Sequence, residues 1–257
     1  MTGSEKITAF RTIVVKEFLR FIRIWVQTIL PPVITTALYF IIFGNLIGSQ
    51  IGDMEGFRYM DYIVPGLIMM AVITNSYGNV VSSFYGSKFQ RNVEEMLVSP
   101  MPNYIILCGY VAGGVTRGII VGIAVTLVSM FFSELQFYNV WVIVSVFILT
   151  SILFSLAGFI NAVYANSFDD ISIVPTFVLT PLTYLGGIFY SISLLPEFWQ
   201  TASLANPILY MVNAFRYGFL GVTDINLGVS YTIIFLFIAI LYTYSMHLLN
   251  NGKGIRT

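Results

Sequence analysis

The chain has 257 residues, of which 57% are hydrophobic and only 9% are charged, and its formal net charge is zero. A soluble domain carries about 25% charged residues, and a fold of this length has too much surface to hide so many apolar side chains from water. The composition therefore excludes a soluble protein, and the balanced charge gives no electrostatic basis for binding nucleic acid.

The first predicted element is an amphipathic helix over residues 5–23. Its basic residues Lys16, Arg20 and Arg23 lie on one face. Apolar residues recur on the other face at steps of three and four, at Ile7, Phe10, Val14, Phe18 and Phe21. This pattern predicts a helix that lies on the membrane, with its apolar face in lipid and its basic face towards anionic headgroups. An ordinary amphipathic helix packed on the protein is the alternative.

Apolar runs long enough to cross a bilayer, which takes about 20 residues, follow along the chain. We expect six spans, near residues 24–47, 61–82, 103–132, 139–165, 171–190 and 229–249. The runs are continuous, whereas barrel strands alternate between lipid and lumen, so helices are predicted. The sequence thus predicts an all-α, polytopic membrane protein made of a single transmembrane domain over residues 1–257.

The placement of Lys and Arg predicts the orientation, because cytoplasmic loops carry an excess of these residues. Six spans with the amino terminus inside leave only Arg58 and Arg216 outside. Nine basic residues then lie inside: Lys6, Arg11, Lys16, Arg20, Arg23, Lys88, Arg91, Lys253 and Arg256. We therefore expect both termini in the cytosol.

The loop at 84–103 is predicted to lie in the cytosol and to hold a short amphipathic helix. Phe89, Val93, Met96 and Leu97 share one face of it, and Arg91, Glu94 and Glu95 share the other. The segment Ser99-Pro100-Met101-Pro102 then ends the helix, since proline lacks an amide donor and disfavours helix in the residue before it. A helix of this kind can fill a groove on a soluble protein; a solvated connector is the alternative.

Arg117 falls in the middle of the third predicted span, among glycines that recur every four residues. A charge at that depth costs about 2.5–3.5 kcal/mol on insertion scales, so a functional role is the default hypothesis. Snorkelling to an interface is the alternative. The glycines Gly109, Gly113, Gly114, Gly118 and Gly122 predict close approach of a neighbouring helix.

The stretch 191–216 is too polar and too rich in proline for a full span, and too apolar for an ordinary loop. Short helices that dip into the outer leaflet and return fit both facts, because irregular backbone at that depth is tolerated only inside protein or beside a wet cavity. We therefore predict re-entrant helices before the last span.

Residues for catalysis or metal binding are scarce. His247 is the only histidine and Cys108 the only cysteine, so no zinc site and no catalytic triad away from His247 can be built. The chain has no G-x-x-x-x-G-K-[ST] loop, and Lys253 lies in a tail that lacks the required strand and helix. We predict no catalytic residues, no metal site and no cofactor, so ATP-driven work would need a partner.

Two stretches give the sequence a family resemblance. One is residues 89–100, from Phe89 through Glu94-Glu95-Met96-Leu97 to Ser99-Pro100. The other runs from Pro181 through Leu185-Gly186-Gly187-Ile188-Phe189 and Leu195-Pro196 to Asn206-Pro207-Ile208-Leu209-Tyr210 and Arg216. With the amphipathic start and six spans, the chain resembles, over essentially its whole length, the integral permease subunits of bacterial ABC (ATP-binding cassette) exporters of the second type.

The resemblance implies an inner-membrane exporter built from a second copy of this chain and two cytosolic ATPase subunits, which would bind ATP and Mg²⁺. It implies that Phe89 to Leu97 form the coupling helix that contacts the ATPase. It also places Arg117 and Arg216 as candidates for the transport path or gating, Pro181, Gly186 and Gly187 at a bend or close-packing point, and Asn206-Pro207 at a turn between the re-entrant helices. A hydrophobic or lipid-linked substrate is compatible with this family.

Three alternatives stay open from the residues. An ion-coupled secondary transporter or channel would need several charges inside the spans, where only Arg117 clearly lies. A membrane-embedded lipid enzyme would need clustered His, Asp or Glu at one membrane face. A scaffold subunit without transport activity is the third.

Overall fold

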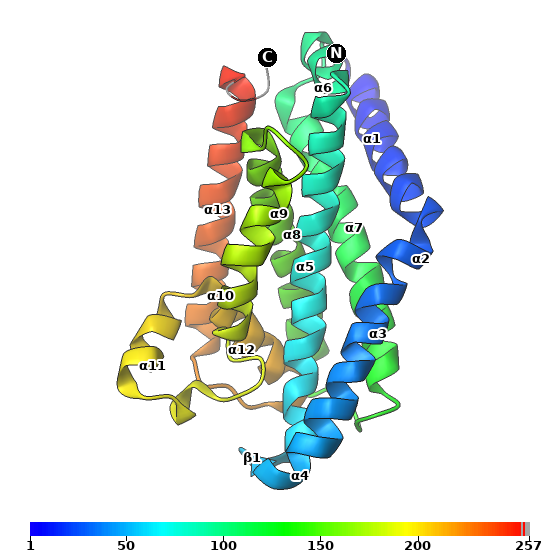
Figure 1. Ribbon diagram of the computed structural model, residues 1–257. Helices are drawn as coiled ribbons and strands as arrows, with labels where there is room; N and C mark the ends of the chain where they lie inside the picture. Colours follow the sequence, from blue (N-terminus) through cyan, green and yellow to red (C-terminus); the bar gives the residue numbers. More distant parts are fainter. Residues whose placement is uncertain (253, 255–257) are drawn as a thin grey trace.

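The computed structural model describes residues 1–252 and 254, with the side chains at all of these positions except 45, 46 and 49. Long helices stand roughly parallel, and the two ends of the chain lie at the same end of the bundle (Figure 1). We call this the terminal end and the other the opposite end. The fold is all-α apart from one hairpin of two short strands, β1 (Asp53–Met54) and β2 (Phe57–Arg58).

The chain begins with α1 (Gly3–Arg23), which starts on a capping box: the Thr2 hydroxyl accepts from the Glu5 amide, and the Glu5 carboxylate accepts from the Thr2 amide. From there it runs to the opposite end through α2 (Trp25–Thr28), α3 (Leu30–Tyr39), the π-helical η1 (Phe40–Ile47) and α4 (Gly48–Ile51). The hairpin turns it back, with positive φ at both Glu55 and Gly56, as a tight two-residue turn requires.

The rest of the chain forms the bundle and its covering helices. Their bounds are α5 (Tyr59–Phe89), α6 (Asn92–Val98), α7 (Asn103–Ser129), α8 (Val140–Tyr164), α9 (Asp170–Val174), the π-helical η2 (Pro175–Leu179), α10 (Thr180–Tyr184), the 3₁₀-helical η3 (Ile192–Leu194), α11 (Glu197–Leu204), α12 (Pro207–Leu220) and α13 (Leu227–Asn251).

Five segments of the described chain are long and apolar enough to cross a membrane: Trp25–Gly44, Tyr59–Phe89, Asn103–Ser129, Val140–Tyr164 and Leu227–Asn251. They match five of the six predicted spans. The segment predicted at 171–190 is helical only over Asp170–Tyr184, in three consecutive pieces, and is not among the five. Its helix is shorter than predicted because the chain leaves helical geometry at the Gly186-Gly187 pair, where Gly187 has a φ of 71°.

Helix α5 occupies the centre of the bundle and packs on α7, α8 and α12. In its apolar window 83% of the residues are buried, against 17% for Trp25–Gly44. The outer helices therefore present most of their apolar surface outwards, as expected where lipid covers the protein.

The glycines of α7 serve two different neighbours. A Cβ at Gly109 would lie 2.6 Å from Ile13 Cγ2, and one at Gly113 would lie 2.6 Å from Glu17 Cβ, so these two positions admit α1. A Cβ at Gly114 or Gly118 would collide with the Ser155 or Ser76 hydroxyl, so these positions admit α8 and α5. The predicted close approach is confirmed, and it involves three helices.

Helix α1 docks on α7, and its docking face differs from the one predicted. Ile13, Glu17 and Phe21 are its buried residues, while Ile7 and Phe18 stay exposed. The predicted basic face does not point wholly outwards. Lys16 reaches Ser87 and Tyr110, and Arg20 reaches Asn79 and Ser82. Glu17 draws both cations inwards, because a buried carboxylate needs partners.

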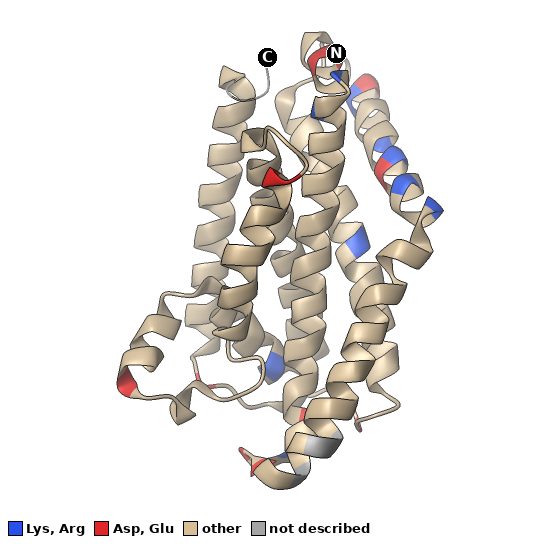
Figure 2. Cartoon of the chain, in the orientation of Figure 1, with Lys and Arg blue, Asp and Glu red and all other residues tan. Residues whose placement is uncertain are grey.

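Basic residues gather at the terminal end of the bundle and acidic residues are prominent at the opposite end (Figure 2). Seven of the nine cations predicted inside lie on α1, on the last turn of α5 or just before α6. Lys253 and Arg256 lie outside the described residues. Arg58 lies at the opposite end, where it pairs with Asp61 at 2.9 Å.

Candidate functional site

A short helix stands out from the bundle at the terminal end. This is α6, which connects α5 to α7 (Figure 1). It corresponds to the amphipathic helix predicted within 84–103, with one correction. Residues 84–89 belong to the long helix α5, so Phe89 is not on α6. Arg91 has a φ of 62°, a left-handed conformation that ends α5 at Gln90 and lets α6 begin in a new direction.

The change of direction alters which side chains α6 presents. Val93 is 1% exposed and anchors the helix to the bundle, and Met96 and Leu97 pack against the same core. Phe89 is 65% exposed and Val98 is 88% exposed. Phe89 nevertheless keeps ring contacts with Tyr85 and Phe168. The predicted apolar face is thus divided: one part holds α6 in place, and the other part points away from the protein.

The charged residues Arg91 and Glu95 are exposed, and Glu94 is partly exposed. The helix ends as predicted, because Ser99 takes an extended conformation before Pro100, and its hydroxyl donates to the Met96 carbonyl at 2.6 Å. A rigid helix with a buried anchor, exposed charges and exposed apolar tips is suited to contact a second protein.

A second candidate lies halfway along α7, at Arg117. Its Nη2 donates to the Asn75 Oδ1 atom on α5 at 3.1 Å. Its Nε is buried and has no hydrogen-bond partner among the described residues. The side chain lines a pocket halfway along the helix and does not extend to the membrane–water interface. Snorkelling therefore does not explain the position of the guanidinium.

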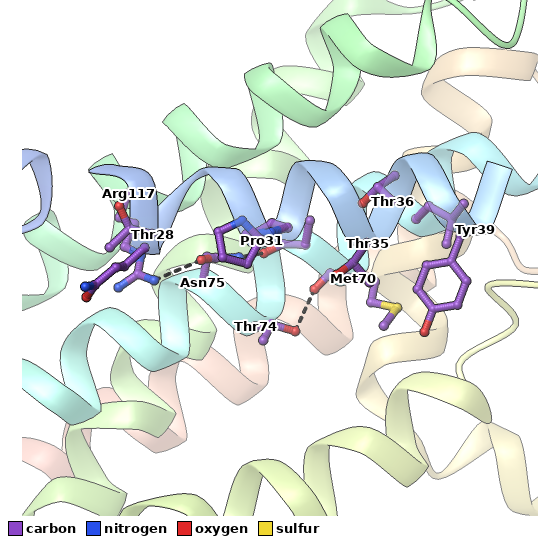
Figure 3. Close-up of a pocket in the computed structure, with 13 residues that line it drawn as sticks. Thr28, Pro31, Thr35, Thr36, Tyr39, Met70, Thr74, Asn75 and Arg117 are labelled. Atoms are coloured by element: carbon purple, nitrogen blue, oxygen red, sulfur yellow. Dashed lines mark hydrogen bonds between the residues drawn. The ribbon is translucent and has the colours of Figure 1, made fainter. Parts of the chain in front are cut away.

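This Arg117 pocket has a volume of about 330 Å³. Helices α2, α3, α5 and α7 form it, with Arg117 and Thr28 towards one end and Tyr39 at the other (Figure 3). Its lining consists of Gln27, Thr28, Pro31, Pro32, Thr35, Thr36, Tyr39, Leu67, Met70, Ala71, Thr74, Asn75 and Arg117. Several of these residues are polar although they lie along spanning helices, which indicates water or protein beside them.

Beyond the pocket, one face of the central helix α5 is open, and we call this face the groove. On the otherwise buried α5, residues at intervals of four stay at least partly exposed: Met70, Thr74, Gly78, Ser82 and Gly86. A Cβ at Gly78 or Gly86 would meet no atom within 4 Å, so this face is open. Helices α3 and α9–α10 flank it (Figure 1). This face was not predicted from the sequence, although small and polar residues recur there every four positions, a periodicity that indicates one side of a helix.

Aromatic rings narrow the groove at the opposite end. The Tyr39 and Tyr184 hydroxyls lie 3.3 Å apart, one from α3 and one from α10. The ring of Phe189 packs against Tyr39, Tyr184 and Phe43, with centroids 4.9–5.8 Å apart. The groove is therefore bridged at this end in the structure.

The predicted stretch 191–216 contains two short helices, α11 and α12, joined at Asn206-Pro207. Asn206 is the N-cap of α12, since its Oδ1 accepts a hydrogen bond from the Ile208 amide at 3.0 Å. Pro207 is the first residue of the helix. Its Nδ2 donates to the Leu182 carbonyl at 2.6 Å, which ties α12 to α10.

Arg216 on α12 is 1% exposed and lies against the same junction. Its guanidinium is 4.0 Å from the Tyr62 ring and donates to the Gly187 carbonyl. Asp224 and Glu55 are close enough to act on its charge. Gly186 faces Ile208, where a Cβ would approach to 2.8 Å, and Pro181 is exposed on α10.

The predicted site residues thus fall into three groups. The coupling residues lie at the terminal end, and Arg117 lies alone at its pocket. Gly186, Gly187, Asn206, Pro207 and Arg216 gather at the junction of α10 with α12. This junction is a packing centre, and the sequence could not separate it from the path.

Comparison with known proteins gives a match to the ABC-2 type transporter family over residues 8–220. The chain is 60% identical over 250 residues to "Inner membrane transport permease YadH" of Escherichia coli K12, with 97% of each chain covered. It is 21% identical over 235 residues to "Nodulation protein J" of Rhizobium leguminosarum bv. viciae, with 91% of each covered.

Proposed function

We propose that this chain, which belongs to the ABC-2 type transporter family, is a permease that forms the substrate path of an ATP-driven exporter. Two copies would assemble in the bacterial inner membrane on two separate ATPase subunits, which bind ATP and Mg²⁺. The observation that carries the proposal is α6, a helix anchored by the buried Val93, with Glu95 and Val98 exposed on it and Phe89 exposed at the adjoining end of α5.

The arrangement of α6 supports a mechanical role. It lies between α5 and α7, which are the walls of the Arg117 pocket. Closure of the ATPase subunits would push on α6, and α5 would carry the displacement as a rigid body along its 31 residues. A permease that receives work in this way needs no nucleotide site of its own.

The topology of the chain supports six crossings. Helix α8 ends at the terminal end and α13 begins towards the opposite end (Figure 1). The chain must therefore return between them, and α9, η2 and α10 form that return. Their 15 residues, Asp170–Tyr184, span about 22 Å at 1.5 Å per residue. The rest of the crossing is made by the packed junction with α12, where irregular backbone is enclosed in protein.

The charge distribution supports an orientation with both termini in the cytosol. Seven described cations at the terminal end face two near the opposite end, Arg58 and Arg216. Positive residues are retained on the cytosolic side during insertion. This orientation also places α6 where a soluble ATPase can reach it.

We assign the substrate path to the groove between α3 and α9–α10. Thr74 on α5, Gln27 on α2 and Thr35 on α3 are exposed polar side chains along it. If these side chains faced lipid, they would raise the free-energy cost of membrane insertion. A second copy of the chain would cover them and remove that cost. The aromatic bridge of Tyr39, Tyr184 and Phe189 would then close the path on the outer side.

The test separates coupling from folding. Glu95→Arg and Val98→Asp, made singly, change exposed side chains of α6 and leave Val93 in place. We expect each to lower export and ATPase co-purification about tenfold, since losing an interface contact of this kind costs more than about 1 kcal/mol. Glu197→Arg, an exposed acid on α11 at the other end of the bundle, is the matched control.

Vanadate-sensitive ATP hydrolysis, export from membrane vesicles and recovery of the ATPase with tagged permease are the readouts. Wild-type recovery and export in both α6 variants would contradict the proposal. Export driven by a proton gradient without any ATPase would favour a secondary transporter instead.

A further inference from the structure

The charge on Arg117 is not offset inside its pocket. Of the thirteen described residues that line the pocket, none is acidic. The guanidinium has five N–H donors, yet among the described residues its side-chain partner is one neutral amide oxygen, on Asn75. The Nε group is buried without a described partner. A buried donor without an acceptor is costly, so this group is available to an acceptor from outside the chain.

The surroundings of the pocket add positive charge. On α1, Lys16, Glu17 and Arg20 lie against α5 and α7. Glu17 is completely buried and is already engaged by Arg20 at 3.4 Å, by Lys16 at 3.9 Å and by the Ser83 hydroxyl. Lys16 and Arg20 therefore share this one acid, and one positive charge on α1 beside the pocket is in excess. Arg20 also repels Arg117 through space.

The other end of the pocket has a different character. From Thr28 at the end of α2 to Tyr39 at the end of α3, the lining extends over eleven residue steps, or about 16 Å. Pro31, Pro32, Leu67 and Met70 supply apolar surface along this length. Two of the lining threonines are satisfied locally, since Thr74 donates to the Met70 carbonyl at 2.9 Å and Thr28 donates to the Ile24 carbonyl at 3.3 Å. The pocket therefore has a cationic end and an apolar body (Figure 3).

We propose that the Arg117 pocket binds an amphiphile with an anionic headgroup, phosphate or carboxylate, whose acidic group pairs with Arg117 and whose chain lies along α3 towards Tyr39. The inference rests on the proposed transport path and names its substrate class. An anionic headgroup supplies the acceptors that the guanidinium lacks, in the planar fork geometry that arginine favours. The apolar part of the pocket accommodates the hydrocarbon chain of the ligand. A free anion would leave this part of the pocket unfilled.

The same chemistry has two sources, an exported amphiphile and a phospholipid of the membrane. Equilibrium binding of radiolabelled dodecyl phosphate to the full-length chain, held in phosphatidylcholine nanodiscs, tests the shared chemistry. Nanodiscs that contain phosphatidylglycerol then distinguish the sources. Loss of dodecyl phosphate binding in these discs identifies the membrane phospholipid, and retained binding identifies an exported amphiphile.

Three variants make the measurement specific. Arg117→Gln keeps a polar side chain and removes the charge, and we expect at least about tenfold weaker binding, as befits a lost hydrogen bond to a charged group. Arg117→Lys keeps the charge but loses the planar fork, and we expect its binding to lie between that of wild type and that of Arg117→Gln. Arg23→Gln, an exposed arginine on α1 outside the pocket, is the control and should bind as wild type.

Two results would overturn the proposal. One is unchanged binding of dodecyl phosphate to a folded Arg117→Gln variant. The other is displacement of the label by inorganic phosphate as effectively as by unlabelled dodecyl phosphate, since the site would then bind only the anion. Binding is measured without any ATPase, so failure here leaves the coupling proposal intact. Conversely, failed coupling in the α6 variants leaves this binding intact.

Discussion

Arg117 and Arg216 are both arginines placed inside an apolar bundle, and the structure gives them opposite settings. Arg216 is enclosed: the Tyr62 ring covers it, the Gly187 carbonyl accepts from it, and the charges of Asp224 and Glu55 act on it. Arg117 borders a pocket and has one amide partner, Asn75. From the sequence, both were candidates for the transport path.

The difference teaches that burial alone does not identify a functional charge. Arg216 has acids close to it and donates to a carbonyl of its own chain, although its Nε and Nη1 are buried without a partner among the described residues. A cation whose counter-charge is missing, beside open volume, is poised for a ligand. By this criterion we propose that Arg216 holds the junction of α10 and α12 together and that Arg117 serves the path.

The largest effect is expected from Arg216→Met. It removes the hydrogen bond from the guanidinium to the Gly187 carbonyl and leaves that buried acceptor unpaired, which costs about 1–3 kcal/mol. We expect most of the protein to be lost from a monodisperse peak in fluorescence-detection size-exclusion chromatography. Because the variant is expected to misfold, Arg216→Lys serves as the second test and should recover part of the folded yield. A folded Arg216→Met that fails only in export would reverse the assignment.

A smaller loss of stability is expected from Gly187→Ala at the same junction. Gly187 has a φ of 71°, and an alanine forced into this left-handed region costs about 1–2 kcal/mol. Thermal unfolding of the purified chain should begin at a lower temperature, with export reduced only in proportion to the folded fraction. Gly86→Ala is the matched control, because its added Cβ would meet no atom within 4 Å. Equal unfolding of the two variants would count against the junction.

The smallest effect on folding and a large effect on function are expected from Arg117→Leu. Removing the charge relieves about 2.5–3.5 kcal/mol of insertion cost, so the variant should fold at least as well as wild type. Export by the complex should fall by at least about tenfold, which corresponds to 1.4 kcal/mol of lost interaction. Wild-type export by this variant would place Arg117 outside the path and erase the contrast with Arg216.

The sequence predicted elements whose cause is local. Five spans appear where continuous apolar runs were found, within several residues of their predicted ends. Ser99-Pro100 ends α6 and Asn206-Pro207 starts α12, because proline and a capping amide act on the backbone next to them. The segment at 171–190 was less predictable, since its helix stops early, before the positive φ of Gly187.

Other features depended on partners far away in the chain. The break at Arg91 divides the predicted coupling face between α5 and α6. Nothing in the residue types around Arg91 predicts its left-handed φ. Helix α1 turns Glu17 inwards because Gly113 on α7 leaves space for it and Ser83 on α5 donates to it. Periodicity places residues on a face, but it does not say which face meets another helix.

The amino-acid sequence by itself determined that this protein belongs in a bilayer, where five of its spans lie, and which helices begin or end beside a proline. Hydrophobic length, proline and the absence of a nucleotide motif are properties of neighbouring residues. Only the tertiary structure decided which buried arginine is held by its own chain and which one faces open volume. That decision depends on counter-charges from Asp224 and Glu55 near Arg216 and on an amide from Asn75 beside Arg117, and Glu55 and Asn75 lie far from those arginines along the chain.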